Sequence, residues 1–305
     1  MDAPSLIGRQ ASVAQLCGLL EQQSFVTVVG PPGMGKSRLA LACVEASRRP
    51  AWWAELDQDA HLDGLFHAVA RALDVKLGGD PAAAIGRHLS RQGDALLVLD
   101  GIEPLADEIP STLAQWRELA PELRLLVTSR ERLRVRHEVV FEVPPLEGAE
   151  GAAVLLERLR RTRPDHAPPA GEWEHLVAIA NALDGIPLAL ELAVAPLEAM
   201  GAEALLHRLD DRLSLLQKNR RDARAGQTTL RRAIEDSWRL LSPEQSQALT
   251  SCAVFRGAFD LDAAAHVLGV PDPVLLLQDL RDRSLLWQPE PGRFRLYESV
   301  RVFAD

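Results

Sequence analysis

Short apolar runs alternate with amphipathic segments between residues 25 and 145. The short runs consist mostly of apolar residues and predict buried strands. The segments in which apolar residues recur every three or four positions predict helices. Such alternation is typical of a mostly parallel sheet with helices on both faces. We predict strands over residues 25–29, 51–56, 95–99, 123–128 and 139–143, and helices over 36–48, 62–73, 81–91 and 111–119.

The strand pattern stops at Pro144 and Pro145, and only helical patterns follow for a long stretch. These patterns predict an all-helical domain over residues 147–216. The segment 217–227 is polar and charged, which predicts a linker, although its basic residues could instead contact nucleic acid. The helices of this domain are predicted over 147–161, 173–183, 187–200 and 202–213.

The last part of the chain combines helices with a hairpin. Two short strand patterns, 284–288 and 293–297, flank a Pro-Glu-Pro-Gly turn at 289–292. Helices followed by a hairpin are the usual order of a winged-helix domain, which we predict over 228–305. A further helical pattern begins at Glu298, and we expect that helix to continue past the last residue. The preceding helices are predicted over 230–241, 243–254, 261–268 and 274–283.

The segment 30–37, Gly-Pro-Pro-Gly-Met-Gly-Lys-Ser, lies between the first predicted strand and the first helix after it. It matches the phosphate-binding loop, in which backbone N–H groups and a helix N-terminus face an anion. Lys36 is predicted to contact the β- and γ-phosphates, and the Ser37 hydroxyl is predicted to bind Mg²⁺. The sequence therefore predicts an α/β P-loop NTPase domain over residues 1–146 that binds a nucleoside triphosphate.

Polar residues at the ends of two other predicted strands extend this site. Asp100 follows four apolar residues and is predicted to hold the Mg²⁺ shell. Glu103 could orient the attacking water or be an ordinary loop side chain. Arg130 could sense a γ-phosphate or be a surface arginine. Gly101 stands where many related ATPases have an acidic base, so we expect slow hydrolysis.

Composition narrows the function classes. A net charge of −9 argues against a surface that coats nucleic acid, although a local basic patch stays possible. The chain has no apolar run long enough to span a membrane and no secretory pattern at its start. Its three cysteines are far apart in the sequence, and we interpret them as reduced core thiols. These features favour a cytoplasmic location.

Taken together, the motifs resemble the STAND class of P-loop ATPases, which includes NB-ARC and NACHT modules. The similarity is greatest to the bacterial branch found in transcriptional regulators and tetratricopeptide-repeat proteins. Residues 6–9 resemble its adenine-bordering motif, 96–100 its Walker B strand, 128–130 its sensor 1, and 185–188 its GxP motif. Residues 280–286 and 294–304 resemble the winged-helix end that carries the nucleotide-sensing MHD motif. The resemblance implies nucleotide contacts from Ile7, Gly8, Arg9, Gly30, Pro32, Gly33, Met34, Gly35, Lys36, Ser37, Arg38, Pro187 and Tyr297, catalytic roles for Lys36, Asp100, Glu103 and Arg130, and metal binding by Ser37 and Asp100.

One departure from this family pattern concerns the nucleotide sensor. Leu296-Tyr297-Glu298 stands in the MHD place, so the sensing histidine is replaced by Tyr297. Its hydroxyl can donate a hydrogen bond, but it cannot become cationic near neutral pH. This departure leaves open whether the ADP-bound off state is held in the same way here.

The resemblance implies a signal-transduction switch that binds ATP or ADP with Mg²⁺. ADP would hold the domains closed, while ATP would permit opening and self-association, with effector and sensor domains outside this chain. Two alternatives remain open. One is an AAA+ type ATPase that handles DNA through a winged helix or a missing domain. The other is a constitutive ATP hydrolase.

Overall fold

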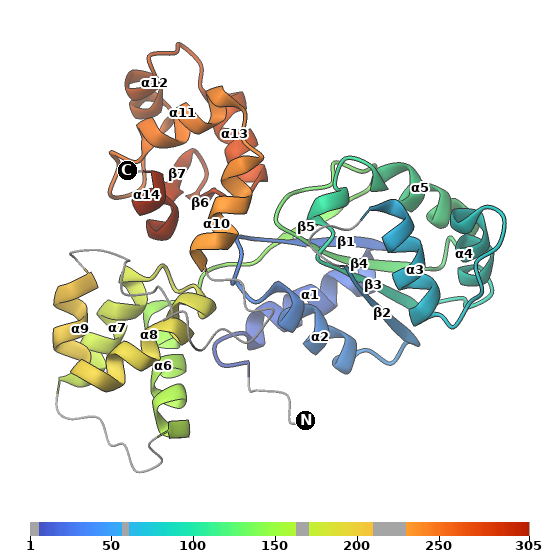
Figure 1. Ribbon diagram of the computed structural model, residues 1–305, viewed down its shortest axis with the longest axis horizontal. Helices are drawn as coiled ribbons and strands as arrows, with labels where there is room; N and C mark the ends of the chain where they lie inside the picture. The colour runs from blue at the N-terminus through green and yellow to red at the C-terminus, as the bar shows by residue number, and fades with distance from the viewer. Residues whose placement is uncertain (1–5, 57–60, 163–170, 210–229, 305) are drawn as a thin grey trace. The chain divides into compact units, whose positions relative to one another are not determined.

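A computed structural model describes residues 6–56, 61–162, 171–209 and 230–304 (Figure 1). The chain divides into two compact units. The sheet unit comprises residues 9–30 and 36–143. The helical unit comprises residues 1–8, 31–35 and 144–305. The predicted linker at 217–227 lies outside the described residues. The division into three domains stays a prediction.

The sheet unit is built on five parallel strands in the order β2-β3-β4-β1-β5. This confirms the predicted parallel sheet. Two of the strands begin and end one residue later than predicted, so Asp100 and Ser129 are the last residues of their strands. The strands are β1 (Phe25–Val29), β2 (Ala51–Glu55), β3 (Leu96–Asp100), β4 (Arg124–Ser129) and β5 (Val139–Glu142).

Helices cover both faces of this sheet, as the alternating pattern predicts (Figure 1). The strand register aligns Phe25, Leu125 and Leu97, and all three belong to one buried cluster that includes Leu113 and Trp116. Alternate strand residues point to opposite faces, so the intervening apolar residues are available to the other helical layer. The helices are α1 (Gln10–Gln22) and α2 (Lys36–Ala46) on one face, and α3 (Leu62–Ala72), α4 (Pro81–Leu89) and α5 (Ile109–Leu119) on the other, with a short 3₁₀ helix over Glu103–Leu105.

The helical unit contains helices and one hairpin, in the order predicted. The hairpin places Leu286 opposite Leu296, but its first strand runs further than expected and includes Pro289. A register shift in this part of the hairpin accommodates a residue that has no N–H to donate. The elements are α6 (Gly148–Thr162), α7 (Glu172–Ala182), α8 (Pro187–Met200), α9 (Ala202–Leu209), α10 (Leu230–Arg239), α11 (Pro243–Cys252), α12 (Leu261–Leu268), α13 (Val274–Asp282), β6 (Leu286–Glu290), β7 (Arg293–Leu296) and α14 (Glu298–Ala304). Their assignment to all-helical and winged-helix domains stays a prediction.

Two of the three cysteines meet in the structure, although they are far apart in the sequence. The sulfur atoms of Cys17 on α1 and Cys43 on α2 lie 2.6 Å apart, and all three cysteines are free thiols. Burial raises the pKa of the Cys43 thiol. The described helices include none that is long and apolar enough to cross a membrane.

Candidate functional site

Lys36 is the first residue of α2 and lies at the end of the phosphate-loop motif. Its ammonium group donates a hydrogen bond of 2.8 Å to the carbonyl oxygen of Gly30, the residue that follows β1. The side chain is only 9% exposed. Burial lowers the pKa of Lys36 to about 8, and nearby Glu103 and Asp100 oppose that fall while Arg130 adds to it. A compact cation is therefore held in a buried place at a helix N-terminus, where an anion would stabilise its charge.

One oxygen of Asp100 accepts two hydrogen bonds at the carboxyl edge of the sheet. The Ser37 hydroxyl donates to Oδ1 at 2.8 Å, and the Thr128 hydroxyl donates to the same atom at 2.5 Å. Thr128 also accepts a 3.0 Å bond from the backbone N–H of Gly101. Asp100 is 7% exposed and Thr128 is 1% exposed. Parallel pairing of β3 with β4 brings Asp100 and Thr128 to the same edge, because the carboxyl ends of parallel strands coincide.

The second carboxylate, Glu103, lies in the 3₁₀ helix that follows β3. It forms an ion pair of 3.7 Å with the guanidinium group of Arg130, just after β4. Both side chains are mostly buried, with 18% and 19% of their surfaces exposed. Arg130 is thus not an isolated surface arginine, and Glu103 is not an unpaired loop side chain.

The tip of the phosphate loop, residues 31–35, belongs to the helical unit. Gly33 has a left-handed backbone (φ +79°), and its carbonyl oxygen accepts a 3.2 Å hydrogen bond from the N–H of Leu188. A Cβ atom at Gly33 would lie 2.5 Å from the Leu188 side chain, so only glycine fits. Pro187 is the first residue of α8, as its fixed φ favours. The other predicted loop residues are in place: Pro32 and Gly35 lie in the loop, Met34 is fully buried, and Arg38 lies in the first turn of α2.

The N-terminal motif is divided between the two units. Ile7 and Gly8 belong to the helical unit, where Gly8 packs against Glu150 of α6. Arg9 belongs to the sheet unit, is 5% exposed and precedes the first turn of α1.

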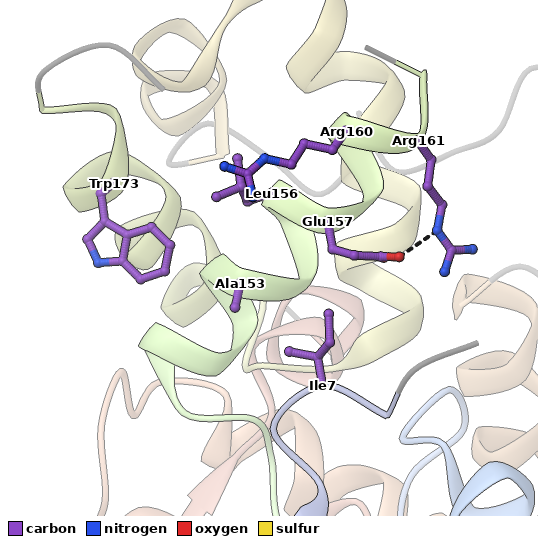
Figure 2. A pocket seen from close by; sticks show the side chains of 7 residues that line it. All are labelled: Ile7, Ala153, Leu156, Glu157, Arg160, Arg161 and Trp173. Carbon is purple, nitrogen blue, oxygen red and sulfur yellow. Dashed lines mark hydrogen bonds and ion pairs between the residues drawn. The ribbon is translucent and has the colours of Figure 1, made fainter. Parts of the chain in front are cut away.

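Ile7 also lines a surface cavity of about 500 Å³ (Figure 2). An ion pair of 2.6 Å joins Glu157 and Arg161 at its rim. The described residues that line it include neither Pro187 nor the glycine loop, so this cavity is not the place predicted for adenine. The lining residues are Ile7, Ala153, Leu156, Glu157, Arg160, Arg161 and Trp173.

Tyr297 lies between β7 and α14 and is 2% exposed. Its ring stacks on Trp287 with a centroid distance of 6.3 Å. The structure therefore places the residue that replaces the sensing histidine within the packing of the hairpin.

Sequence reasoning did not include Thr128 among the site residues. The predicted strand 123–128 ends in polar residues, which is typical of a site at the sheet edge, but only Arg130 was predicted to contact the nucleotide. The backbone contact of Leu188 with Gly33 could not be predicted, because it depends on which distant segments pack together.

Comparisons with known proteins agree with this geometry. The model of the AAA ATPase domain matches residues 5–224. The chain belongs to the AAA ATPase domain family. It is 34% identical over 271 residues to the uncharacterized protein Rv0894 of Mycobacterium tuberculosis, covering 86% of this chain and 68% of that protein. It is 32% identical over 298 residues to Rv0890c of the same organism, a predicted HTH-type transcriptional regulator, covering 94% of this chain and 34% of that protein.

Two solved structures are also similar to this AAA ATPase domain. The Walker-type ATPase PABY2304 of Pyrococcus abyssi matches with a TM-score of 0.60 and 14% identity, over 98% of this chain and 95% of that one. At this identity the match shows the fold alone. The STAND protein PH0952 of Pyrococcus horikoshii, which has a tetratricopeptide-repeat sensor, matches with a TM-score of 0.45 and 14% identity, over 95% and 41% of the two chains.

The predicted resemblance of the chain to STAND-like P-loop ATPases is confirmed. The chain carries an ATPase domain of STAND or AAA type that also occurs in regulator-like proteins, and nucleotide binding is expected of such a domain. The chain spans about a third of the length of the regulators that it matches. Any activity or partner of a full-length regulator therefore applies to this chain only as a proposal.

Proposed function

We propose that this chain is an ATP- and ADP-binding switch with slow, Mg²⁺-dependent hydrolysis. The observation that carries the proposal is the shared oxygen of Asp100, which accepts hydrogen bonds from both Ser37 and Thr128 beside buried Lys36. A hydroxyl and a carboxylate within 2.8 Å of each other form an oxygen donor set that suits Mg²⁺. Ser37 and Asp100 would hold the ion, and the bound ion would neutralise charge on the phosphates.

The residues of the candidate site have separate tasks in this proposal. Lys36 would exchange its bond with the Gly30 carbonyl for phosphate oxygens, which are better partners for a buried cation. Thr128 would orient the carboxylate of Asp100 and hold the backbone of Gly101. Arg130 would sense the γ-phosphate with its planar guanidinium group. Adenine would lie between Pro187 and the segment that includes Ile7, Gly8 and Arg9, with the phosphates on the glycine loop that includes Pro32 and Met34.

Slow turnover is supported by the surroundings of the candidate base. Gly101 offers no side chain next to Asp100 and its N–H is engaged by Thr128. Glu103 is held by Arg130, so its carboxylate is less available to take a proton from water. Release of that ion pair would have to precede fast hydrolysis.

Switching requires that ATP and ADP differ in affinity for two arrangements of the chain. The contact between Gly33 and Leu188 supports this part of the proposal, because it joins the tip of the phosphate loop to α8. We propose that ADP favours a closed arrangement and that ATP favours an open one able to self-associate. The division into nucleotide-binding (1–146), helical (147–216) and winged-helix (228–305) domains, a cytoplasmic location and effector or sensor domains outside this chain belong to the same proposal.

The test is to release and identify the nucleotide that copurifies with the chain and then to measure turnover with Mg²⁺. Retained ADP with turnover well below about 1 s⁻¹ is the expected result, since phosphoryl-transfer enzymes such as kinases reach about 1–100 s⁻¹. A chain that binds neither nucleotide would contradict the phosphate-loop assignment. Turnover in the enzyme range would favour the constitutive hydrolase.

The similarity to transcriptional regulators keeps an ATPase that handles DNA as the second candidate. Such a protein would bind duplex DNA through its C-terminal helices and hairpin, and affinity would fall steeply with salt. The net charge of −9 disfavours this candidate. Fluorescence anisotropy with labelled duplex DNA at two salt concentrations distinguishes the two candidate functions, since the switch predicts that this chain does not bind DNA.

A further inference from the structure

The turn between α7 and α8 contacts three segments that are distant in the sequence. At its end, the N–H of Leu188 donates to Gly33 in the phosphate loop. In its centre, the carbonyl oxygen of Gly185 accepts a 3.1 Å bond from the N–H of Leu146. At its start, the carboxylate of Asp184 accepts hydrogen bonds from the N–H groups of Glu298 and Ser299, the latter at 3.4 Å. The turn is thus bonded both to the phosphate loop and to α14.

The backbone of this turn leaves little freedom to move one contact without the others. Gly185 has a left-handed φ of +58°, and a Cβ atom there would lie 2.0 Å from the carbonyl oxygen of Leu146. Asp184 also adopts a left-handed φ of +54°, which is uncommon for a residue with a side chain. Pro187 fixes the next part of the turn. A displacement of Leu188 would therefore be transmitted to Asp184 over only four residues.

Asp184 supplies the cap of α14 from another part of the chain. Helix N-termini leave N–H groups without intrahelical partners, and a preceding Asp, Asn, Ser or Thr usually accepts from them. The residue before α14 is Tyr297, whose ring stacks on Trp287 and is not a capping side chain. Asp184, 114 residues before Glu298, takes this role and also places a negative charge at the positive end of the helix.

The surroundings of Asp184 on balance oppose its ionisation. Burial raises the pKa of Asp184 to about 7, and the N–H of Glu298 and the charge of Arg295 on β7 only partly offset it. The carboxylate of Glu298 also opposes ionisation of Asp184, although it is paired with Arg301 on α14. The cost of burying this carboxylate offsets part of the stabilisation that the cap gives to α14.

We propose that Asp184 is the positioning residue that couples the state of the phosphate loop to α14 and to Tyr297. This inference rests on the proposed switch and names the contact through which the nucleotide is reported. A shift of Gly33 on exchange of ADP for ATP moves Leu188, the turn moves Asp184, and α14 loses its cap. The coupling runs in both directions, so removal of Asp184 also changes the relative affinities of the two nucleotides.

The test is amide hydrogen exchange of peptides from β7 and α14, with ADP and with a non-hydrolysable ATP analogue. In the wild-type chain we expect exchange of α14 to be at least about fivefold faster with the ATP analogue. Asp184→Ala should reduce that difference to less than about twofold and bring the affinities for the two nucleotides closer together. Asp184→Asn keeps an acceptor oxygen and should restore most of the difference.

The matched control is Asp260, which caps α12 in the same unit through a 2.9 Å bond from the N–H of Ala263. Asp260→Ala should loosen α12 but leave the nucleotide-dependent difference in α14 unchanged. An Asp184→Ala variant that keeps the wild-type difference would overturn the inference and leave the switch intact. A wild-type chain that binds both nucleotides but shows the same exchange with each would refute the switch itself.

Discussion

The site in the sheet unit and the turn in the helical unit are held together in different ways. Around Asp100, the contacting residues lie at the ends of the adjacent strands β3 and β4 and, in the case of Ser37, in the first turn of α2, and ladders of backbone hydrogen bonds hold the strands. Around Asp184, segments far apart in the sequence are joined by one or two hydrogen bonds each. The first arrangement suits chemistry, which needs fixed distances. The second suits the contact that we propose to open and close with the bound nucleotide.

The largest effect should come from the buried cation of the sheet unit. Lys36→Ala removes the ammonium group that faces the phosphates, so we expect ATP affinity to fall by about 100-fold or more in a calorimetric titration. Lys76→Ala is the control, because Lys76 is an exposed lysine of the same unit. Unchanged affinity in Lys36→Ala would remove the basis for placing phosphate there.

The next effect separates binding from hydrolysis. Asp100→Asn keeps the shape of the side chain but removes its charge, so we expect Mg²⁺-dependent turnover to fall about 100-fold while nucleotide affinity changes only a few-fold. Asp107→Asn, an exposed carboxylate a short distance along the chain, should leave turnover unchanged. If both variants hydrolyse ATP at the wild-type rate, the metal is bound elsewhere.

Two buried threonines of the sheet provide a matched pair. Thr128→Val removes a hydroxyl that bridges Asp100 and Gly101, so we expect a loss of about 1–2 kcal/mol in stability and lower turnover. Thr27 lies fully buried in β1, and its hydroxyl has no hydrogen-bond partner among the described residues. Thr27→Val should therefore be neutral or stabilise by up to about 1 kcal/mol. Thermal unfolding measures the stability of both variants, and an ATPase assay measures their turnover. Equal losses in the two variants would mean that the hydrogen bonds of Thr128 contribute to neither quantity.

The smallest effect concerns pH and the helical unit. The pKa of Asp184 is raised from its usual 3.8 to about 7, so between these values the folded chain keeps a proton that the unfolded chain has released. The stability that this group contributes is full below about pH 4 and is lost as the pH rises through about 7. Relative to Asp184→Asn, the wild type should lose about 1–2 kcal/mol between pH 5 and pH 8, allowing for partial exposure. If the difference in stability between the wild type and Asp184→Asn does not change with pH, the pKa of Asp184 is not raised by burial.

Most of the sheet unit could be predicted from the sequence, because its signals are local. The strand 25–29 was predicted with its observed bounds, two other strands end one residue earlier than predicted, and β3 and β4 are each displaced by one residue. In the helical unit, α8 was also predicted with its observed bounds. The phosphate loop follows from eight consecutive residues. The hairpin was less accurate, since Pro289 belongs to its first strand rather than to the turn. A proline usually marks a turn. It can stand in a strand here because both strands of a two-stranded sheet are edge strands, where the missing N–H need not pair with a neighbour.

The amino-acid sequence by itself determined that a glycine loop follows a buried strand and that Asp100 ends another. Both depend on the spacing of neighbouring residues, which the chain carries wherever it folds. Only the tertiary structure decided that Ser37 and Thr128 share one oxygen of Asp100, because that depends on strand register, where a slip of one residue turns each side chain to the other face. It also decided that Asp184 caps α14, since no local pattern specifies which distant helix a carboxylate meets.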